Sequence, residues 1–455
     1  MSMPDAALEH WIQEQYARAA TWMQPSLSPV ALTKQRPGFG QTIHPVRGSI
    51  VASPVLADYD PDPDYFFHWF RDSAVIIDAL RLLYLDGTAG VEARSQFADF
   101  VRFSLALREL DGRKLTMAPA WRSRVAPAFV RFLREDADLE RVCGELVVAE
   151  TRVNADGSLD ISKWARPQHD GVPLRALALM RWARSVELER ELLPLVATLI
   201  HSDLEFTLRH AREPSFDMWE EENGLHYHTL CVSAAALDEG ARWVEGTGSA
   251  AQAPAYRAES AAIRELLDGF WLPEAGYYRS RVLSSGERSP KELDIAVVLA
   301  AIHSCTGWDT HSVHDPRVHA TLARLEALFD ATYPINRSRT SGMGPALGRY
   351  PGDVYYSGGA YYFSTLGAAE LCFRAASRAA GPAWLERGDA FLATVRAFTP
   401  QSGEMSEQFD QHTGAQTSAR HLAWSYAAFI SCVAARRAVV ASAAAPEQQR
   451  SRRVE

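Results

Sequence analysis

Cysteine is scarce and unpaired in this chain of 455 residues. The five cysteines are Cys143, Cys231, Cys305, Cys372 and Cys432. No CxxC pair occurs, so the spacing predicts neither a zinc ribbon nor a disulfide framework. Four of the five stand in apolar runs, where a buried, reduced thiol is expected. The first thirty residues also lack the basic-then-apolar order of a secretory signal. We therefore expect a cytoplasmic protein; secretion or a periplasmic location would require a signal that has been removed.

Long apolar runs and an excess of positive charge are also missing. No stretch reaches the roughly 18 uncharged apolar residues that a membrane-spanning helix needs. The chain has 47 basic and 56 acidic residues, a net charge of −9, and no basic stripe. The sequence thus argues against a membrane or a nucleic acid as partner.

The common nucleotide and nucleophile motifs are absent too. There is no GxxxxGK[ST], no GxGxxG between a strand and a helix, and no GxSxG. His226 and His228 form an HxH, but a zinc site needs three or four ligands and no further cluster lies nearby. We expect no metal and no cofactor. The remaining partner is a small molecule or an oligosaccharide substrate, and the sequence leaves the oligomeric state open.

Helical periodicity dominates what is present. The expected helices are 5–23, 71–86, 92–109, 172–186, 190–209, 229–245, 254–270, 292–304, 315–332, 358–378, 383–397 and 420–440. Strand patterns are few, and the best are 49–55 and 276–283. The prediction is an all-α protein.

Long loops follow alternate predicted helices. They are 24–70, 110–171, 210–228, 333–357 and 398–419, rich in Gly, Pro, Trp, Tyr and Asp. Loops this long in a compact domain are usually functional. Six helical hairpins with these loops at one end predict an (α/α)6 barrel, a six-hairpin toroid. We expect one catalytic domain over 1–445, with an N-terminal helix and loop extension, and a disordered tail over 446–455.

A cluster of carboxylates and an indole stands in FDMWEEENGLHYHT, residues 216–229. Asp217, Trp219, Glu220, Glu221 and Glu222 fall within six positions. A carboxyl group partly desolvated by an indole can hold a proton at neutral pH. Three consecutive glutamates also fit a solvated turn, so this segment alone decides nothing.

A second carboxylate cluster, GEMSEQF, occupies residues 403–409. Glu404 and Glu407 both fit the role of a base there. One acid and one distant base among aromatic residues are what hydrolysis of a glycosidic bond requires.

Three further loops combine aromatic and charged residues. Arg71 and Asp72 open a helix after an aromatic run, where the aspartate could also serve as a cap. Trp164 and Arg166 precede several hydrogen-bonding groups, which suits a sugar with one apolar face and fixed hydroxyls. An Arg–Asp pair that only fixes this loop is the alternative. Arg349 stands among five tyrosines at 347–363, where entry to a core helix is the alternative.

Taken together, six motifs resemble the glucoamylase family. They are YFFHWFRDSA, KWARPQHDGVPLRA, DMWEEENG, GRYPGDVYYSGG, MSEQFD and TSARHLAWSYAA, in the family's order over about residues 65–430. The family comprises inverting, exo-acting α-glucosidases with an (α/α)6 barrel, which agrees with the helices counted above.

The resemblance assigns roles to individual residues. The Glu directly after Trp is the family's general acid, here Glu220, and the Glu of the SEQ motif is its general base, here Glu407. Glu221 would contact the sugar on the leaving-group side. The substrate-binding residues expected from the loops and the resemblance together are Tyr65, Trp69, Arg71, Asp72, Trp164, Arg166, Asp217, Trp219, Glu221, Arg349, Tyr355 and Trp424.

The sequence departs from the family's motifs at three positions. Gly352 stands where an acidic residue is frequent, Tyr361 where Trp is frequent, and His421 where the last motif commonly has Asp. These positions affect the leaving-group side, where linkage and chain-length preference are set. The resemblance implies release of β-glucose from α-linked gluco-oligosaccharides. A trehalase, an isomaltose or dextran glucosidase, and a non-catalytic sugar-binding regulatory module are the alternatives.

Overall fold

The computed structural model describes residues 6–59, 61–248, 250–377 and 381–444. The expected tail 446–455 lies outside these residues. Each of the twelve expected helices is present, with ends shifted by a few residues. The long helices are α1 (Ala6–Met23), α2 (Phe70–Leu85), α3 (Glu92–Leu107), α6 (Gly171–Ser185), α7 (Leu193–His210), α8 (Tyr227–Gly246), α9 (Ala253–Asp268), α10 (Ala296–Ser304), α11 (Pro316–Thr332), α13 (Tyr362–Ala375), α14 (Gly381–Phe398) and α15 (Ala423–Ala444).

The long helices form two concentric layers. The inner layer consists of α2, α6, α8, α10, α13 and α15; each contacts the next, and α15 contacts α2. These helices are buried on most sides: in α13 the side chains from Tyr362 to Phe373 are buried without a break. The outer helices bury one stripe, as in α9, where five residues are buried. Alternation of inner and outer helices along the chain closes the ring, so the predicted (α/α)6 barrel is confirmed.

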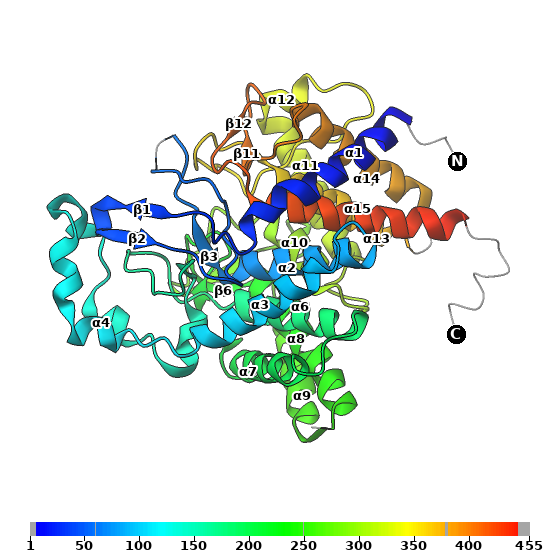
Figure 1. The fold of residues 1–455 in the computed structure, drawn as a ribbon. Helices are drawn as coiled ribbons and strands as arrows, with labels where there is room; N and C mark the ends of the chain where they lie inside the picture. The colour runs from blue at the N-terminus through cyan, green and yellow to red at the C-terminus, as the bar shows by residue number, and fades with distance from the viewer. Residues whose placement is uncertain (1–5, 60, 249, 378–380, 445–455) are drawn as a thin grey trace.

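Every connection from an outer helix to the next inner helix is long. Because the inner helices run in one direction, these connections all meet at their N-terminal ends. In Figure 1 the labelled strands and the short helix α4 (Arg113–Met117) lie to the left of most of the long helices. The connections include one over 269–295 that we did not expect to be a functional loop. One end of the barrel is therefore covered by irregular chain that can present polar side chains.

The loops contain short strands and helices. The strands are β1 (Lys34–Arg36), β2 (Gln41–Ile43), β3 (Phe67–Trp69), β4 (Arg152–Asn154), β5 (Ser215–Phe216), β6 (Asn223–His226), β7 (Trp271–Leu272), β8 (Tyr277–Tyr278), β9 (Arg281–Leu283), β10 (Ala360–Tyr361), β11 (Gln408–Phe409) and β12 (Gln416–Thr417). The short α-helices are α4 (Arg113–Met117), α5 (Asp136–Glu140) and α12 (Pro334–Arg337). The 3-10 helices are η1 (Gln24–Ser26), η2 (Pro37–Phe39), η3 (Pro119–Arg124), η4 (Pro127–Phe132), η5 (Gly144–Ala149) and η6 (Ala250–Gln252). All strand pairs are antiparallel and short.

The two strand predictions have different outcomes. The 276–283 segment contains β8 and β9, although a break separates them. The 49–55 prediction is wrong, because this segment has only an isolated bridge between Ile50 and Leu27. Its next backbone groups bond to different segments: Val51 donates to Ser26, and Ala52 donates to Phe67. No regular ladder can form with two partners that diverge.

Two further findings concern the whole chain. All five cysteines are free thiols, and the cytoplasmic location expected from them stays a prediction. In the part of the chain that the structure describes, no helix is both long and apolar enough to cross a membrane.

Candidate active site

A small hollow lies on the barrel axis beneath the long loops. Its volume is about 50 Å³. It is lined by Ala52, Tyr65, Trp69, Arg71, Asp72, Met218, Trp219, Glu220, Arg349, Phe363, Glu407, Leu422 and Trp424. At its inner side the rings of Phe363 and Trp424 stack, with centroids 4.3 Å apart and planes 7° from parallel. Both predicted catalytic carboxylates therefore line one hollow.

A strained turn between β5 and β6 presents Glu220. Its φ of +67° is left-handed, which is uncommon for a residue with a side chain. Asp217 holds the turn: its Oδ1 accepts the backbone N–H groups of Glu221 at 2.7 Å and Glu222 at 3.1 Å. Its Oδ2 accepts from Arg281 Nη1 at 3.0 Å. Asp217 is 2% exposed and does not line the hollow, so it positions Glu220 from below.

Three N–H donors surround the Glu220 carboxylate. Oε1 accepts from Trp69 Nε1 at 2.8 Å and from Arg71 Nη2 at 3.1 Å. Oε2 accepts from Trp164 Nε1. The surroundings of Glu220 are thus polar donors, not the apolar contacts that the sequence suggested.

Glu407 comes from the opposite side of the hollow, directly before β11. Its backbone N–H donates to the Ala419 carbonyl at 2.8 Å, and β11 pairs with β10 and β12. Its Oε2 accepts from the Ser418 hydroxyl, and its Oε1 lies 3.5 Å from the Tyr65 hydroxyl. Burial raises the pKa of Glu407 to about 7, against the opposing effects of Ser418 and Arg349. Near neutral pH this side chain can change its charge.

Charged groups in the hollow have unused hydrogen-bonding capacity. Arg71 Nη2 lies 3.2 Å from Asp72 Oδ2, yet Asp72 Oδ2 and Arg71 Nε form no hydrogen bond with any residue that the structure describes. Burial raises the pKa of Asp72, and Arg71 opposes the shift. Buried polar atoms normally have partners, so the Arg71–Asp72 pair keeps hydrogen-bonding capacity beside the hollow.

A wider pocket of about 490 Å³ adjoins Glu221 and Tyr355. Glu221 Oε2 accepts from Lys291 Nζ at 2.7 Å, and its Oε1 accepts from Arg349 Nη2 at 3.2 Å and from the Tyr350 hydroxyl at 2.6 Å. The Tyr355 hydroxyl lies 2.8 Å from that of Tyr65, which lines the hollow. This outer pocket therefore has the position of a leaving-group site.

Most of the predicted substrate-binding residues line the hollow, and five do not. Glu221 and Tyr355 line the outer pocket, and Asp217 lies under the turn. Trp164 is 42% exposed and reaches Glu220 from outside. Arg166 bonds Glu150 and Asp160 through Nε and Nη2, at 2.8 and 2.9 Å, which matches the alternative of an arginine that fixes its loop. Contact between Arg166 and a substrate stays a prediction.

Sequence reasoning missed several residues that support the site. Arg281 contacts Asp217, Glu222 and Asp294, and Asp294 accepts from Trp219 Nε1 at 2.9 Å. Burial raises the pKa of Asp294 to about 6 although Arg281 opposes the shift. Both residues belong to the 269–295 connection, whose charges carry no local motif. In the sequence, Arg281 stands out only as a charged residue inside the strand pattern 276–283.

The three departures from the family's motifs occupy different environments. Gly352 lines the outer pocket with a φ of +74°, and a Cβ there would meet nothing within 4 Å. Tyr361 is fully buried and donates to Asp353 at 3.2 Å. His421 contacts the Tyr426 hydroxyl at 2.8 Å and packs on Trp22. Only Gly352 faces a pocket where a leaving group could lie.

Known proteins resemble this chain over most of its length. The family model "Glycosyl hydrolases family 15" matches residues 146–434. A probable glucoamylase of Schizosaccharomyces pombe is 27% identical, over 96% of this chain and 94% of that protein. A glucoamylase of Neurospora crassa is 28% identical over 86% of this chain, which matches 64% of that longer protein. The solved glucoamylase of Hypocrea jecorina has the same fold, with a TM-score of 0.75 at 23% identity over 95% of this chain and 73% of that one. The family model covers most of the chain, and the chain has an (α/α)6 barrel with two carboxylates in one hollow. The protein is therefore a glucoamylase-like glycoside hydrolase that belongs to glycosyl hydrolases family 15.

Proposed function

We propose that the protein is an exo-acting, inverting α-glucoside hydrolase that releases β-D-glucose from the non-reducing ends of α-linked gluco-oligosaccharides. The observation that carries this proposal is the placement of Glu220 and Glu407 on one hollow, beside a separate outer pocket at Glu221. An inverting hydrolase needs one carboxyl group to protonate the leaving oxygen and another to activate water on the opposite face.

The hollow is closed at its inner side, its floor, and this supports an exo mode of action. The stacked rings of Phe363 and Trp424 end the hollow, so a chain that enters it cannot continue past the floor. A terminal sugar would lie against the side chains of Asp72 and Arg71, and the rest of the substrate would extend into the outer pocket. A hollow of about 50 Å³ holds only a few water molecules. Side chains that line the hollow therefore have to move when a sugar ring enters.

Substrate binding has to favour the ionised form of Glu407. Burial raises the pKa of Glu407 to about 7, whereas a base has to be ionised when it activates water. A water molecule held by Glu407 would donate to that carboxylate and so favour its ionised form.

Proton NMR of the anomeric signals during the first minutes of hydrolysis tests the proposal. Maltose, isomaltose and trehalose are supplied in parallel to the fresh protein. Early β-glucose from maltose supports the proposal. Early β-glucose from isomaltose or trehalose alone would show that the substrate has that linkage instead. Early α-glucose would contradict inversion. If maltotriose and longer chains also release no glucose, the protein is a non-catalytic sugar-binding module.

A further inference from the structure

A second cavity lies on the barrel axis, on the other side of the Phe363–Trp424 stack from the active-site hollow. Its volume is about 390 Å³, within the usual range of small-molecule sites. Five inner helices contribute to it, α2, α6, α10, α13 and α15. Phe363 and Trp424 line both spaces. We call it the rear cavity.

The sequence creates this space with small side chains on the inner helices. Eight alanines line it: Ala74, Ala79, Ala178, Ala427, Ala428, Ala434, Ala435 and Ala438. Larger apolar residues, among them Leu174 and Ile302, complete an apolar lining. Protein interiors are normally close-packed. The small side chains leave this cavity open, and larger residues at the alanine positions would fill it.

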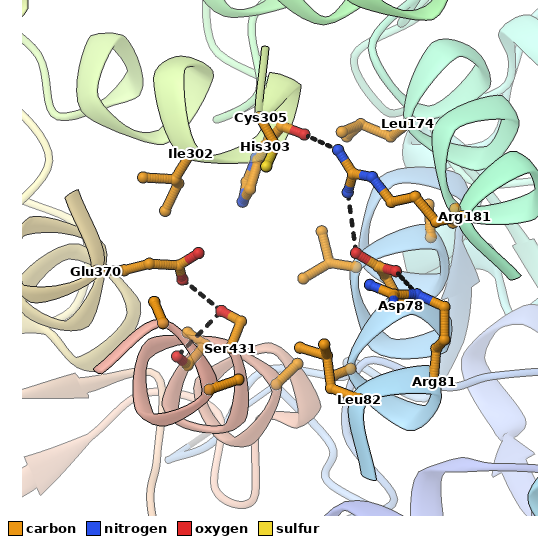
Figure 2. Close-up of a pocket in the computed structure, with 18 of the residues that line it drawn as sticks. Asp78, Arg81, Leu82, Leu174, Arg181, Ile302, His303, Cys305, Glu370 and Ser431 are labelled. Atoms are coloured by element: carbon orange, nitrogen blue, oxygen red, sulfur yellow. Dashed lines mark hydrogen bonds and ion pairs between the residues drawn. The ribbon is translucent and has the colours of Figure 1, made fainter. Parts of the chain in front are cut away.

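Charged groups converge on the cavity from two sides. Figure 2 shows Asp78, Arg81 and Arg181 on one side of the open centre and Glu370 and Ser431 on the other. Asp78 accepts from Arg81 Nε at 2.7 Å and from Arg181 Nη1 at 2.9 Å. The two guanidinium groups thus share one carboxylate.

Two more arginines line the cavity, and each has its own carboxylate. Arg374 Nε donates to Glu370 at 2.7 Å, and Arg184 pairs with Glu239. The four guanidinium groups have three carboxylate partners, Asp78, Glu370 and Glu239, which leaves one positive charge in excess in a protein whose net charge is −9.

The helix ends explain only part of this arrangement. The inner helices direct their C-terminal ends toward this side of the barrel, and carbonyl groups there attract cations. Arg181 serves such an end, because its Nη2 donates to the carbonyl oxygens of His303 at 2.7 Å and Ser304 at 3.3 Å. Arg81 does not: among the described residues its two terminal nitrogens have no hydrogen-bond partner. Its side chain is nevertheless only 13% exposed.

We propose that the rear cavity binds a small organic carboxylate with an apolar body. The carboxylate would accept the free N–H groups of Arg81, and the alkyl or aryl body would lie against the alanines of α15. A guanidinium group matches a carboxylate with two parallel hydrogen bonds. The excess positive charge favours the carboxylate of such a molecule, and the apolar lining favours its alkyl or aryl body.

Calorimetric titration with three six-carbon probes tests the proposal: hexanoate, hexan-1-ol and hexylammonium. The probes share an alkyl chain and differ in charge. We expect hexanoate to bind at one site per chain and at least about tenfold more tightly than hexan-1-ol, as one charge-assisted contact implies. Equal affinity for hexanoate and hexan-1-ol, tighter binding of hexylammonium, or no binding of any probe at millimolar concentration would overturn the proposal.

Two variants locate the bound probe. Arg81→Gln keeps the Asp78–Arg181 pair and should weaken hexanoate about tenfold while leaving hexan-1-ol unchanged. Arg102→Gln is the matched control, since Arg102 is 53% exposed on α3 and pairs with Asp99. Ala435→Phe should fill the cavity and abolish binding. Hexanoate affinity that is the same in Arg81→Gln as in Arg102→Gln would overturn the proposal even if Ala435→Phe fails to fold.

Discussion

The hydroxyl group of Ser418 donates a hydrogen bond to Oε2 of Glu407. This contact opposes the effect of burial, which raises the pKa of Glu407 to about 7. A base must be ionised to act, so activity falls on the acid side as this group takes up its proton.

Ser418→Ala should therefore move the acid limb of the kcat/KM profile to higher pH. Loss of one hydrogen bond to the ionised form predicts a shift of about one pH unit. The measurement is kcat/KM on maltose from pH 4 to 9, with Ser402→Ala, an exposed hydroxyl elsewhere, as control. An acid limb that stays in place, or moves to lower pH, would show that Glu407 does not govern it.

Asp217 fixes the left-handed turn that presents Glu220. Asp217→Ala removes the acceptor of two backbone N–H groups and one partner of the buried Arg281. We expect a free energy of unfolding lower by about 2–4 kcal/mol and a kcat/KM lower by about a hundredfold, as a displaced catalytic group implies.

Asp217→Asn gives the graded comparison, because an amide oxygen can still accept both backbone N–H groups. Urea unfolding and kinetics on maltose should place it between the wild type and Asp217→Ala. If Asp217→Ala retains full activity, the turn does not depend on this side chain.

Arg281 neutralises the carboxylates packed behind the Glu220 turn. Its side chain is 1% exposed and contacts Asp217, Glu222 and Asp294. Arg281→Met leaves these groups without their shared cation, so the free energy of unfolding should fall by about 3–5 kcal/mol.

Arg212→Met is the matched control for this substitution. Arg212 is 56% exposed and pairs with Glu259, and an exposed pair of this kind contributes less than about 1 kcal/mol. Equal losses of stability in the two variants, measured by urea unfolding, would contradict the structural role of Arg281.

Gly352 leaves the outer pocket without the acidic side chain that is frequent at this position. Gly352→Glu should change the KM for disaccharides more than it changes kcat for those it still cleaves, because the new carboxylate would face the leaving group. The left-handed φ of +74° predicts a loss of about 1–2 kcal/mol of stability.

Gly352→Asn controls for backbone strain, since asparagine tolerates this conformation better. The ratio of kcat/KM for maltose to that for isomaltose should change in Gly352→Glu and stay near the wild-type value in Gly352→Asn. Identical ratios in all three proteins would exclude position 352 from linkage selection.

The helices were predictable because each buries a periodic apolar face, and the ring followed from their number and from the alternating long loops. Glu220 and Glu407 were found through local motifs in two such loops. Arg281 and Asp294 were missed, because Arg281 meets Asp217 across 64 positions of the chain and neither residue has a motif of its own. The strand expected at 49–55 failed for a related reason: its backbone partners, Ser26 and Phe67, come from two separate segments, which no local pattern indicates.

The assignment of Glu220 as acid and Glu407 as base is the central claim, and α-glucosyl fluoride tests it most directly. Fluoride leaves without protonation, so this substrate needs the base but not the acid. Glu220→Gln and Glu407→Gln are compared on maltose and on α-glucosyl fluoride. Both variants should lose maltose hydrolysis by about a hundredfold or more.

On α-glucosyl fluoride, Glu220→Gln should keep activity within about tenfold of the wild type, while Glu407→Gln should lose about a hundredfold or more. Retention of fluoride hydrolysis by Glu407→Gln and its loss in Glu220→Gln would show that the two carboxylates have the opposite roles.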